Sequence, residues 1–217
     1  MAHFTVIGLG RFGISASLEL IHLGHTVTGV DSNPKLVEKY VEYLSETIIC
    51  DSTDETALKE LDLTNSEAVL VAIGADMQSS ILCTLALKNL AVEQIWVKAS
   101  TKAHHTIISK LGVTRIIHPE DEMGVRVAQA LNCPVVNDYI SLGNDLYVVE
   151  VSIKAHLHQT QLGDLLKGIK GVIDPLLVKR GKLTFIHLDN SFQLLKCDIL
   201  LLSGNRAKLN YIAPRLL

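Results

Sequence analysis

The sequence of 217 residues lacks any long apolar run. Its longest runs, such as Ala68–Ile73 and Ile199–Leu202, fall far short of the roughly 20 residues that a membrane-spanning helix needs. The chain also enters a strand pattern almost at once, without the basic segment and apolar stretch of an export signal. We therefore expect a protein that is located in the cytoplasm and has no membrane span of its own.

Cysteine is scarce and widely spaced. The four cysteines are Cys50, Cys83, Cys133 and Cys197. They form no Cys-x-x-Cys pair of the kind that holds zinc or carries out redox chemistry. We expect each of them to be a small buried apolar residue in a reducing compartment.

Basic residues are not concentrated, and clear metal-ligand spacing is missing. A formal net charge of −3 without a basic cluster gives no electrostatic reason to expect nucleic acid as a partner. The histidines at positions 104, 105, 118, 156 and 158 show no common face backed by carboxylates. We expect each of these histidines to be a surface residue or a hydrogen-bonded one rather than a metal ligand.

Hydrophobic patterning is strong, with 48% hydrophobic residues. Up to about Leu131, short β-rich runs alternate with helical periodicities, which is typical of βαβ units. The expected strands are His3–Ile7, Thr26–Asp31, Thr47–Cys50, Ala68–Ile73, Gln94–Ala99 and Thr114–Ile117. The expected helices are Arg11–Leu23, Pro34–Leu44, Glu55–Leu61, Met77–Leu90, Thr101–Leu111 and Asp121–Leu131. We predict an α/β fold, a Rossmann-type doubly wound parallel sheet of six strands.

The pattern changes around Cys133–Asn137, and a small strand-rich α+β domain is expected beyond it. Its expected strands are Leu146–Ile153, Val172–Val178, Leu183–His187 and Asp198–Leu202, with a short helix at Leu162–Leu166. In the first domain, Asn33 and Pro34 predict a helix start, and Gly24 and Gly112 predict helix ends.

A glycine-rich turn follows the first expected strand and opens the first expected helix. It reads Gly8-Leu9-Gly10-Arg11-Phe12-Gly13, which fits the G-x-G-x-x-G pattern. In such a turn the first glycine permits the tight bend, the second lets phosphates approach the backbone, and the third allows close helix packing. The amides and the dipole at the helix N-terminus then favour an anion.

Acidic residues end the second and third expected strands. Asp31 lies where a carboxylate accepts hydrogen bonds from ribose hydroxyls and repels a 2′-phosphate, so we expect NAD, ATP or ADP. The segment Asp51–Asp54 reaches the same sheet edge, although Thr53 or Asp54 also suits a helix cap. Arg11 fits either a phosphate contact or a solvated first-turn arginine.

In combination these motifs resemble the regulator of potassium conductance (RCK, or TrkA-N) domain. The resemblance rests on the segments Gly8–Gly13, Asp31–Asn33, Asp51–Asp54, Ala72–Gly74 and Gly112–Glu120. The later segments Leu162–Leu165 and Lys196–Asn205 are similar to the companion TrkA-C domain. The resemblance therefore implies a nucleotide-binding domain over residues 1–132 and a TrkA-C domain over residues 137–217.

The resemblance also implies a site. The implied nucleotide-binding residues are Gly8, Gly10, Arg11, Phe12, Gly13, Asp31, Ser32, Asn33, Asp51, Ser52, Ile73, Gly74 and Lys98. Among them, Arg11 would contact the terminal phosphate, Lys98 would lie near the phosphates, and Asp51 with Ser52 would lie near the adenine. Glu120 matches a carboxylate that is associated with a divalent or monovalent cation in some members.

One such pair of domains without a membrane segment resembles the cytosolic regulatory subunits of Ktr-type potassium uptake systems. The resemblance implies a non-enzymatic subunit at the inner face of the cell membrane, docked on a membrane potassium transporter. It further implies homodimers that assemble into an octameric ring, with ATP favouring the active arrangement and ADP the inactive one.

Two other functions fit the same turn and carboxylate. NAD or NADH is an alternative ligand, in a regulator of a potassium efflux channel or a cation/proton antiporter. An NAD-dependent dehydrogenase is the enzyme alternative, but the last 80 or so residues offer no evident His–carboxylate pair as its acid or base.

Overall fold

The computed structural model describes residues 1–132, 136–169 and 173–216. These residues form two compact units, Met1–Pro119 and Glu120–Leu217. In the described part of the chain, no helix combines the length and the apolar composition that crossing a bilayer requires.

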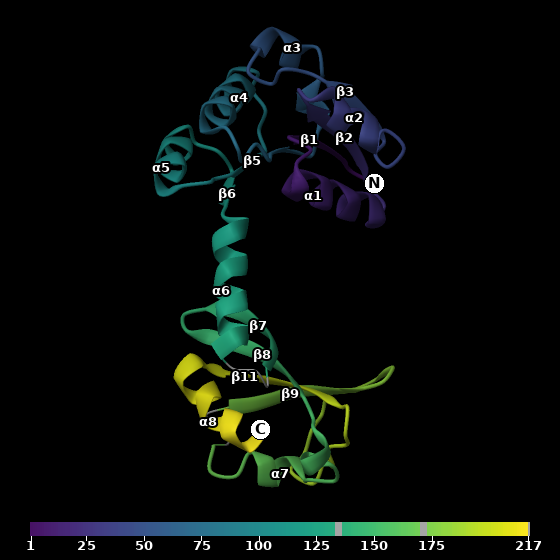
Figure 1. Cartoon of the computed structure of the whole chain (residues 1–217), viewed down its shortest axis with the longest axis vertical. Coiled ribbons are helices and arrows are strands. Elements are labelled where there is room, and N and C mark those ends of the chain that lie inside the picture. The colour runs from purple at the N-terminus through teal and green to yellow at the C-terminus, as the bar shows by residue number, and fades with distance from the viewer. Residues whose placement is uncertain (133–135, 170–172, 217) are drawn as a thin grey trace. The chain divides into compact units, whose positions relative to one another are not determined.

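The first unit is built on a six-stranded parallel sheet (Figure 1). Its strands are β1 (His3–Ile7), β2 (Thr26–Asp31), β3 (Glu46–Ile49), β4 (Ala68–Val71), β5 (Ile95–Lys98) and β6 (Arg115–Ile117). The strand order is β3-β2-β1-β4-β5-β6, with the order reversing between β1 and β4. This is the predicted Rossmann-type topology, in which ligands bind at the carboxyl ends of the strands near that reversal.

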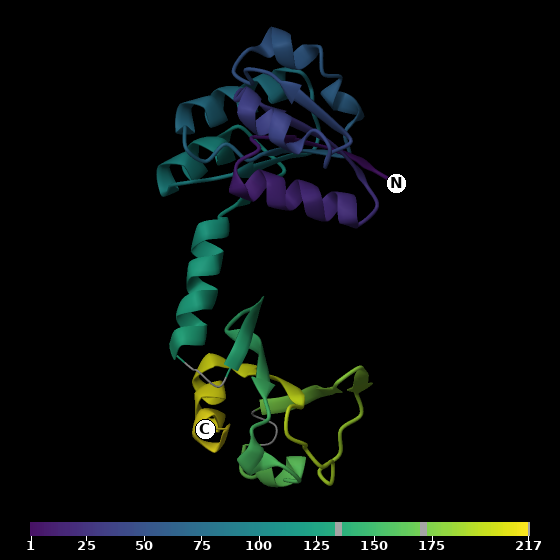
Figure 2. The same ribbon diagram turned by 45° about the vertical axis from the view of Figure 1, so that its right-hand side comes forward.

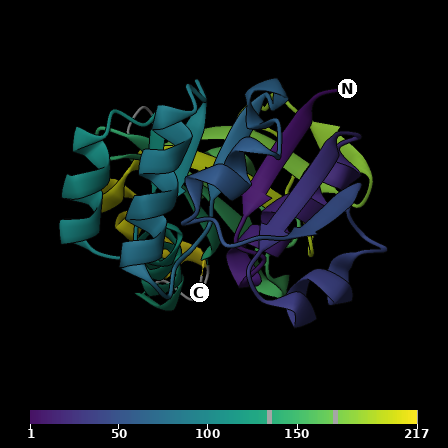
Figure 3. The same ribbon diagram turned by 90° about the horizontal axis from the view of Figure 1, so that it is seen from above.

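Helices cover both faces of this sheet. They are α1 (Arg11–His22), α2 (Pro34–Tyr40), α3 (Glu55–Lys59), α4 (Met77–Asn89) and α5 (Lys102–Lys110), with a 3₁₀ turn at Leu63–Asn65. Residues of α1 and α2 pack together with Val6 and Val27 on one face, whereas α3, α4 and α5 pack against Ile7 and Val30 on the other. Figure 3 looks onto the strands β1–β3, drawn in purple and blue. Each face is apolar because alternate strand residues point to opposite sides.

Several helix ends lie where local sequence signals place them. The Asn33 side chain accepts a hydrogen bond from Lys35 N and caps α2, with Pro34 in its first turn. Gly24 and Gly112 follow the ends of α1 and α5 with φ of 85° and 68°, so both predicted ends are confirmed. The prediction that α2 continues to Leu44 is wrong, because α2 ends at Tyr40. Leu44 instead turns back and is buried with α1 and α2.

The second unit contains a five-stranded antiparallel sheet in the order β10-β9-β11-β8-β7. Its elements are α6 (Pro119–Asn132, beginning at the last residue of the first unit), β7 (Val136–Gly143), β8 (Leu146–Ser152), α7 (Leu162–Leu165), β9 (Ile173–Arg180), β10 (Leu183–Phe185), β11 (Ile199–Asn205) and α8 (Arg206–Leu216), with a 3₁₀ turn at Ala155–Leu157. The strand-rich prediction is confirmed, although β7 and α8 were not expected. Residue 172, where the expected β9 begins, lies outside the described residues.

Helix α8, in yellow in Figure 2, closes the core of the second unit. Its buried residues Leu209, Ile212 and Leu216 pack with the strand residues Val149, Val151, Leu200 and Leu202 and with their buried neighbours. Arg215 near its end donates hydrogen bonds to the carbonyl oxygens of Leu165 and Lys167, at and just beyond the end of α7.

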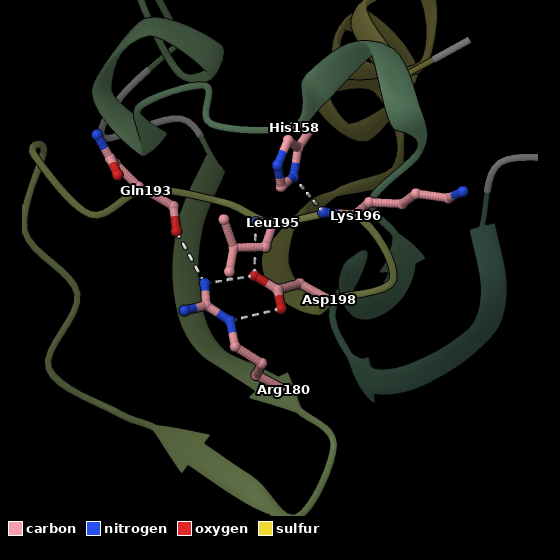
Figure 4. A network of polar contacts seen from close by, with 6 residues as sticks. All are labelled: His158, Arg180, Gln193, Leu195, Lys196 and Asp198. Atoms are coloured by element: carbon pink, nitrogen blue, oxygen red, sulfur yellow. Dashed lines mark hydrogen bonds and ion pairs between the residues drawn. The ribbon is translucent and has the colours of Figure 1, made fainter.

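A buried carboxylate organises the loop before β11 (Figure 4). Asp198 is 1% exposed and accepts two hydrogen bonds from Arg180, from Nε and Nη2, and one from Leu195 N, all at 2.8 Å. Arg180 also donates to the Gln193 carbonyl oxygen and lies over the Phe185 ring. Burial acts to raise the pKa of Asp198, but the hydrogen bonds from Arg180 and Leu195 outweigh it, so the pKa is lowered.

The prediction that every cysteine is buried is only partly right. Cys83 is fully buried and Cys50 is half-buried. Cys197 is exposed, because it occupies a left-handed turn position, with φ of 69°, immediately before Asp198. Cys133 lies outside the described residues.

Candidate functional site

The glycine turn between β1 and α1 has the shape that each of its glycines allows. Gly8 has φ of 98°, in the region that favours glycine, and its amide donates to the Val30 carbonyl oxygen at 2.7 Å. A Cβ on Gly13 would overlap the Gly8 carbonyl oxygen, so α1 approaches β1 only without a side chain there. A Cβ on Gly10 would meet nothing within 4 Å. Gly10 therefore borders open space, and Gly8 and Gly13 shape the turn.

The N-terminus of α1 is available to an anion. Gly10 is its N-cap, and within the described residues no side chain caps the helix and its first turn is free of acidic residues. The first amides of a helix have no partner inside the helix, and the helix dipole adds positive potential at this end. The turn therefore has the geometry and polarity that bind phosphate groups elsewhere.

Asp31, at the end of β2, is held against this turn. Its Oδ2 accepts a hydrogen bond from Leu9 N at 2.7 Å, and its Oδ1 accepts one from Asn33 N at 2.8 Å. The carboxylate thus links the glycine turn to the start of α2. Each oxygen keeps a further lone pair, which can accept a hydrogen bond from a ligand hydroxyl.

A cavity of about 340 Å³ opens at this edge of the sheet. The predicted site residues that line it are Gly8, Gly10, Asp31, Ser32, Asp51, Ser52, Ile73 and Gly74. Thr53 and Leu36 line it as well, as do Ala75, Asp76 and Ser79 from the start of α4. The α4 residues were not predicted. Their sequence reads as an ordinary helix cap, and Asp76 does cap α4 by accepting from Gln78 N.

The other predicted residues lie around the cavity or away from it. Arg11 is exposed in the first turn of α1, Phe12 is half-buried there, and Gly13 is buried. Asn33 serves as the α2 cap. The half-buried Lys98, at the end of β5, places Nζ 5.7 Å from the centroid of the Phe12 ring.

Glu120, the predicted cation ligand, belongs to the second compact unit. It is exposed in the first turn of α6, where acidic residues also favour the helix dipole. Its role at a cation therefore stays a prediction.

Two carboxylates of the cavity lining, Asp51 and Asp76, have pKa values below their usual range. Hydrogen bonds from the Thr53 amide and hydroxyl hold the pKa of Asp51 below its usual value. Hydrogen bonds from Ser79, and one from Gln78 N, do the same for the pKa of Asp76. The buried Ser52 is hydrogen-bonded to the thiol of Cys83, whose pKa is raised by burial to about 12. Cys83 is thus a neutral residue behind the cavity wall.

One histidine, His104, differs from the prediction of a surface or hydrogen-bonded residue. His104 is fully buried, and its Nδ1 lies 3.3 Å from Ser100 N, but its Nε2 has no hydrogen-bond partner in the described part of the chain. It is therefore neither a surface nor a fully hydrogen-bonded residue, because α5 packs it into the unit, and burial lowers its pKa. His105 Nδ1 and His118 Nε2 share a hydrogen bond of 2.8 Å that sequence spacing did not reveal. The described residues contain no cluster of three or more metal-ligating side chains.

Comparison with known proteins places this geometry in context. The TrkA-N domain family matches residues 4–119. Ktr system potassium uptake protein A of Bacillus subtilis is 44% identical over 162 residues, which cover 75% of this chain and 73% of the relative. Ktr system potassium uptake protein C of the same organism is 37% identical over 214 residues, covering 99% and 97%. The RCK domain of GsuK shares the fold at 14% identity, with a TM-score of 0.65 over 99% of this chain and 47% of that one.

Proposed function

Because this chain belongs to the TrkA-N domain family and is homologous to Ktr system potassium uptake proteins along nearly its whole length, we propose that it is the nucleotide-sensing gating subunit of a potassium uptake system. Residues 1–132 are its nucleotide-binding domain and residues 137–217 its TrkA-C domain. In this division α6 belongs to the nucleotide-binding domain, whereas compactness groups it with the second unit.

One observation carries the nucleotide proposal. The cavity brings the uncapped N-terminus of α1 and the Asp31 carboxylate to the same space of about 340 Å³. A helix N-terminus suits a phosphate, and a carboxylate at the end of β2 suits ribose hydroxyls. The adenosine diphosphate moiety, which ATP, ADP and NAD share, contains both groups.

The enzyme alternative is overturned by the relatives. A dehydrogenase needs a substrate domain with an acid or base, whereas the match that covers 99% of this chain is to a potassium uptake protein. The chain is thus a transport-system protein rather than an enzyme, and we propose that its site binds a ligand without reacting with it.

Binding becomes regulation only if a ligand prefers one conformation of the protein. A nucleotide shifts an equilibrium by its difference in affinity for two states, and a coupling of about 1–3 kcal/mol is ordinary. We assign this difference to the γ-phosphate of ATP, which Arg11 contacts and which ADP lacks, and we propose separately that Glu120 binds a cation. The subunits form homodimers within an octameric ring, held at the cytoplasmic face of the membrane by the transporter.

Flux measurements test this proposal. Vesicles that contain the transporter and this protein should take up potassium several-fold faster with ATP than with ADP. Arg11→Ala should remove that difference, whereas Lys110→Ala, an exposed residue in the last turn of α5, should keep it. Equal uptake with both nucleotides in the unchanged protein would contradict the proposal. A response to NADH over NAD instead would favour the alternative ligand.

A further inference from the structure

The cavity has an acidic lining, although its proposed ligand carries phosphates. Asp31, Asp51 and Asp76 all line it, and among the described lining residues there is no lysine or arginine. Backbone amides and the α1 dipole supply only partial positive charge. A side chain that reaches the rim of the cavity can supply a full positive charge.

Lys98 reaches that rim by passing over Gly74. The three atoms nearest to the position of a Cβ on Gly74 all belong to Lys98, with Nζ at 3.0 Å, Cε at 3.4 Å and Cδ at 3.8 Å. Gly74 itself lines the cavity. The end of the lysine side chain therefore lies in tight contact with the position that a Cβ at residue 74 would take.

The backbone gives no other reason for glycine at position 74. Its φ lies outside the left-handed region, unlike that of Gly8, so residues with a side chain can adopt its conformation. The three nearest atoms to a Cβ here belong to the end of one flexible side chain. A methyl group at this position would therefore push the ammonium group aside by a few tenths of an ångström.

The Phe12 ring lies near the same ammonium group. The Nζ atom of Lys98 lies 5.7 Å from the centroid of the Phe12 ring, within the range of a cation–π contact. Phe12 is the second residue of α1 and follows directly on Gly10 and Arg11. The ammonium group thus lies near both Gly74 at the cavity rim and the first turn of the helix proposed to bind phosphate.

We propose that Gly74 is a positioning residue, whose missing side chain lets the Lys98 ammonium lie beside the α1 N-terminus and bind a nucleotide phosphate. This inference rests on the proposed nucleotide-binding function and adds a specific structural requirement to it. A residue with a side chain at position 74 would weaken nucleotide binding through its effect on Lys98.

Calorimetric titration with ADP tests the inference in a double-mutant cycle. Lys98→Met should weaken ADP binding about tenfold, the loss expected when one charge-assisted contact is removed. Gly74→Ala should weaken it by a smaller factor, because the methyl group shifts the ammonium group without removing it. The double variant should bind ADP no more weakly than Lys98→Met, because the methyl group then has no ammonium to displace. Both single variants should also show a smaller loss of affinity on raising salt. The matched controls Gly124→Ala, in α6, and Lys110→Met should bind ADP like the unchanged protein.

The outcomes separate this inference from the proposed function. If Gly74→Ala binds ADP like the unchanged protein, or if the two losses multiply in the double variant, Gly74 does not act through Lys98. If Gly74→Ala unfolds at a lower temperature and the double variant does too, its role is structural and the inference is wrong. If the unchanged protein does not bind ADP, the proposed function fails and this inference with it.

Discussion

Both carboxylate oxygens of Asp31 accept backbone hydrogen bonds, one from Leu9 N and one from Asn33 N. We predict that Asp31→Ala lowers the free energy of unfolding by about 1–2 kcal/mol, because two amides lose a charged acceptor. It should also abolish discrimination against a 2′-phosphate on the ribose. Urea unfolding and titration with NAD and NADP measure the two effects. Glu38→Ala, on the exposed side of α2, is the control and should change neither.

Asp198 is a buried carboxylate of the second unit that is paired with Arg180. We predict that Asp198→Asn costs about 3 kcal/mol of stability, because it leaves the Arg180 guanidinium without its buried partner. The pair Arg126–Asp138 has a similar length, but its side chains are 47% and 41% exposed, so Asp138→Asn should cost less than about 1 kcal/mol. Equal losses in urea unfolding for the two variants would show that burial does not set the difference.

The same carboxylate predicts a pH dependence. The pKa of Asp198 is lower in the folded chain than in the unfolded one. Its contribution is therefore complete above the unfolded pKa, about 4, and is lost as the pH falls through the folded value. Unfolding experiments between pH 7 and pH 3 should show Asp198→Asn and the unchanged protein converging in stability at the acidic end. A constant gap across that range would contradict the assignment.

At the scale of elements, two glycines of the turn between β1 and α1 have different roles: Gly13 matters for stability and Gly10 for nucleotide binding. We predict that Gly13→Ala lowers stability by about 2 kcal/mol or more, because its Cβ overlaps the Gly8 carbonyl oxygen. Gly10→Ala should leave stability nearly unchanged, because its φ of −65° suits any residue and nothing lies within 4 Å. It should nevertheless weaken nucleotide binding, since the methyl group would enter the phosphate space. Thermal unfolding and ADP titration of the two variants should give opposite patterns.

Local signals in the sequence predict most elements of the first unit. Strands β1, β2, β4 and β5 are largely buried apolar runs. Asn33 caps a helix through its side chain, and Gly24 and Gly112 end helices through their left-handed backbone conformation. The elements of the second unit are harder to predict, because the local signals in its sequence conflict. Only two residues of β7 are buried, so its alternation is weak, and Pro214 inside α8 reads as a helix breaker.

Some residues of the candidate site could likewise be predicted from the sequence, and others could not. Cavity residues that end a strand or follow one, such as Asp31 and Ser52, could be placed from sequence, because parallel strands end at one edge of the sheet. Asp76 and Ser79 could not, since a helix cap looks the same whether or not it faces a cavity. The route of Lys98 over Gly74 depends on side-chain packing that no sequence pattern encodes.

At the scale of the whole molecule, the first unit carries the turn, the carboxylate and the cavity, and the second has its own sheet and its own core. A ligand that binds the folded first unit should therefore stabilise that unit most. Hydrogen exchange, measured with and without ADP, should show that ADP slows exchange more strongly in β1, α1 and β2 than in β8 and β11. Uniform protection of both units would show instead that nucleotide binding acts on the chain as one body.

The most direct test of the central claim is thermal unfolding of the purified protein with ATP, ADP, NAD and NADH, each with and without magnesium. A ligand that binds only the folded state at a hundred times its Kd stabilises it by about 2.7 kcal/mol, a shift of several degrees in Tm. The account predicts such a shift for at least one of these nucleotides and a smaller one in Gly10→Ala. No shift with any of them at millimolar concentration would contradict it.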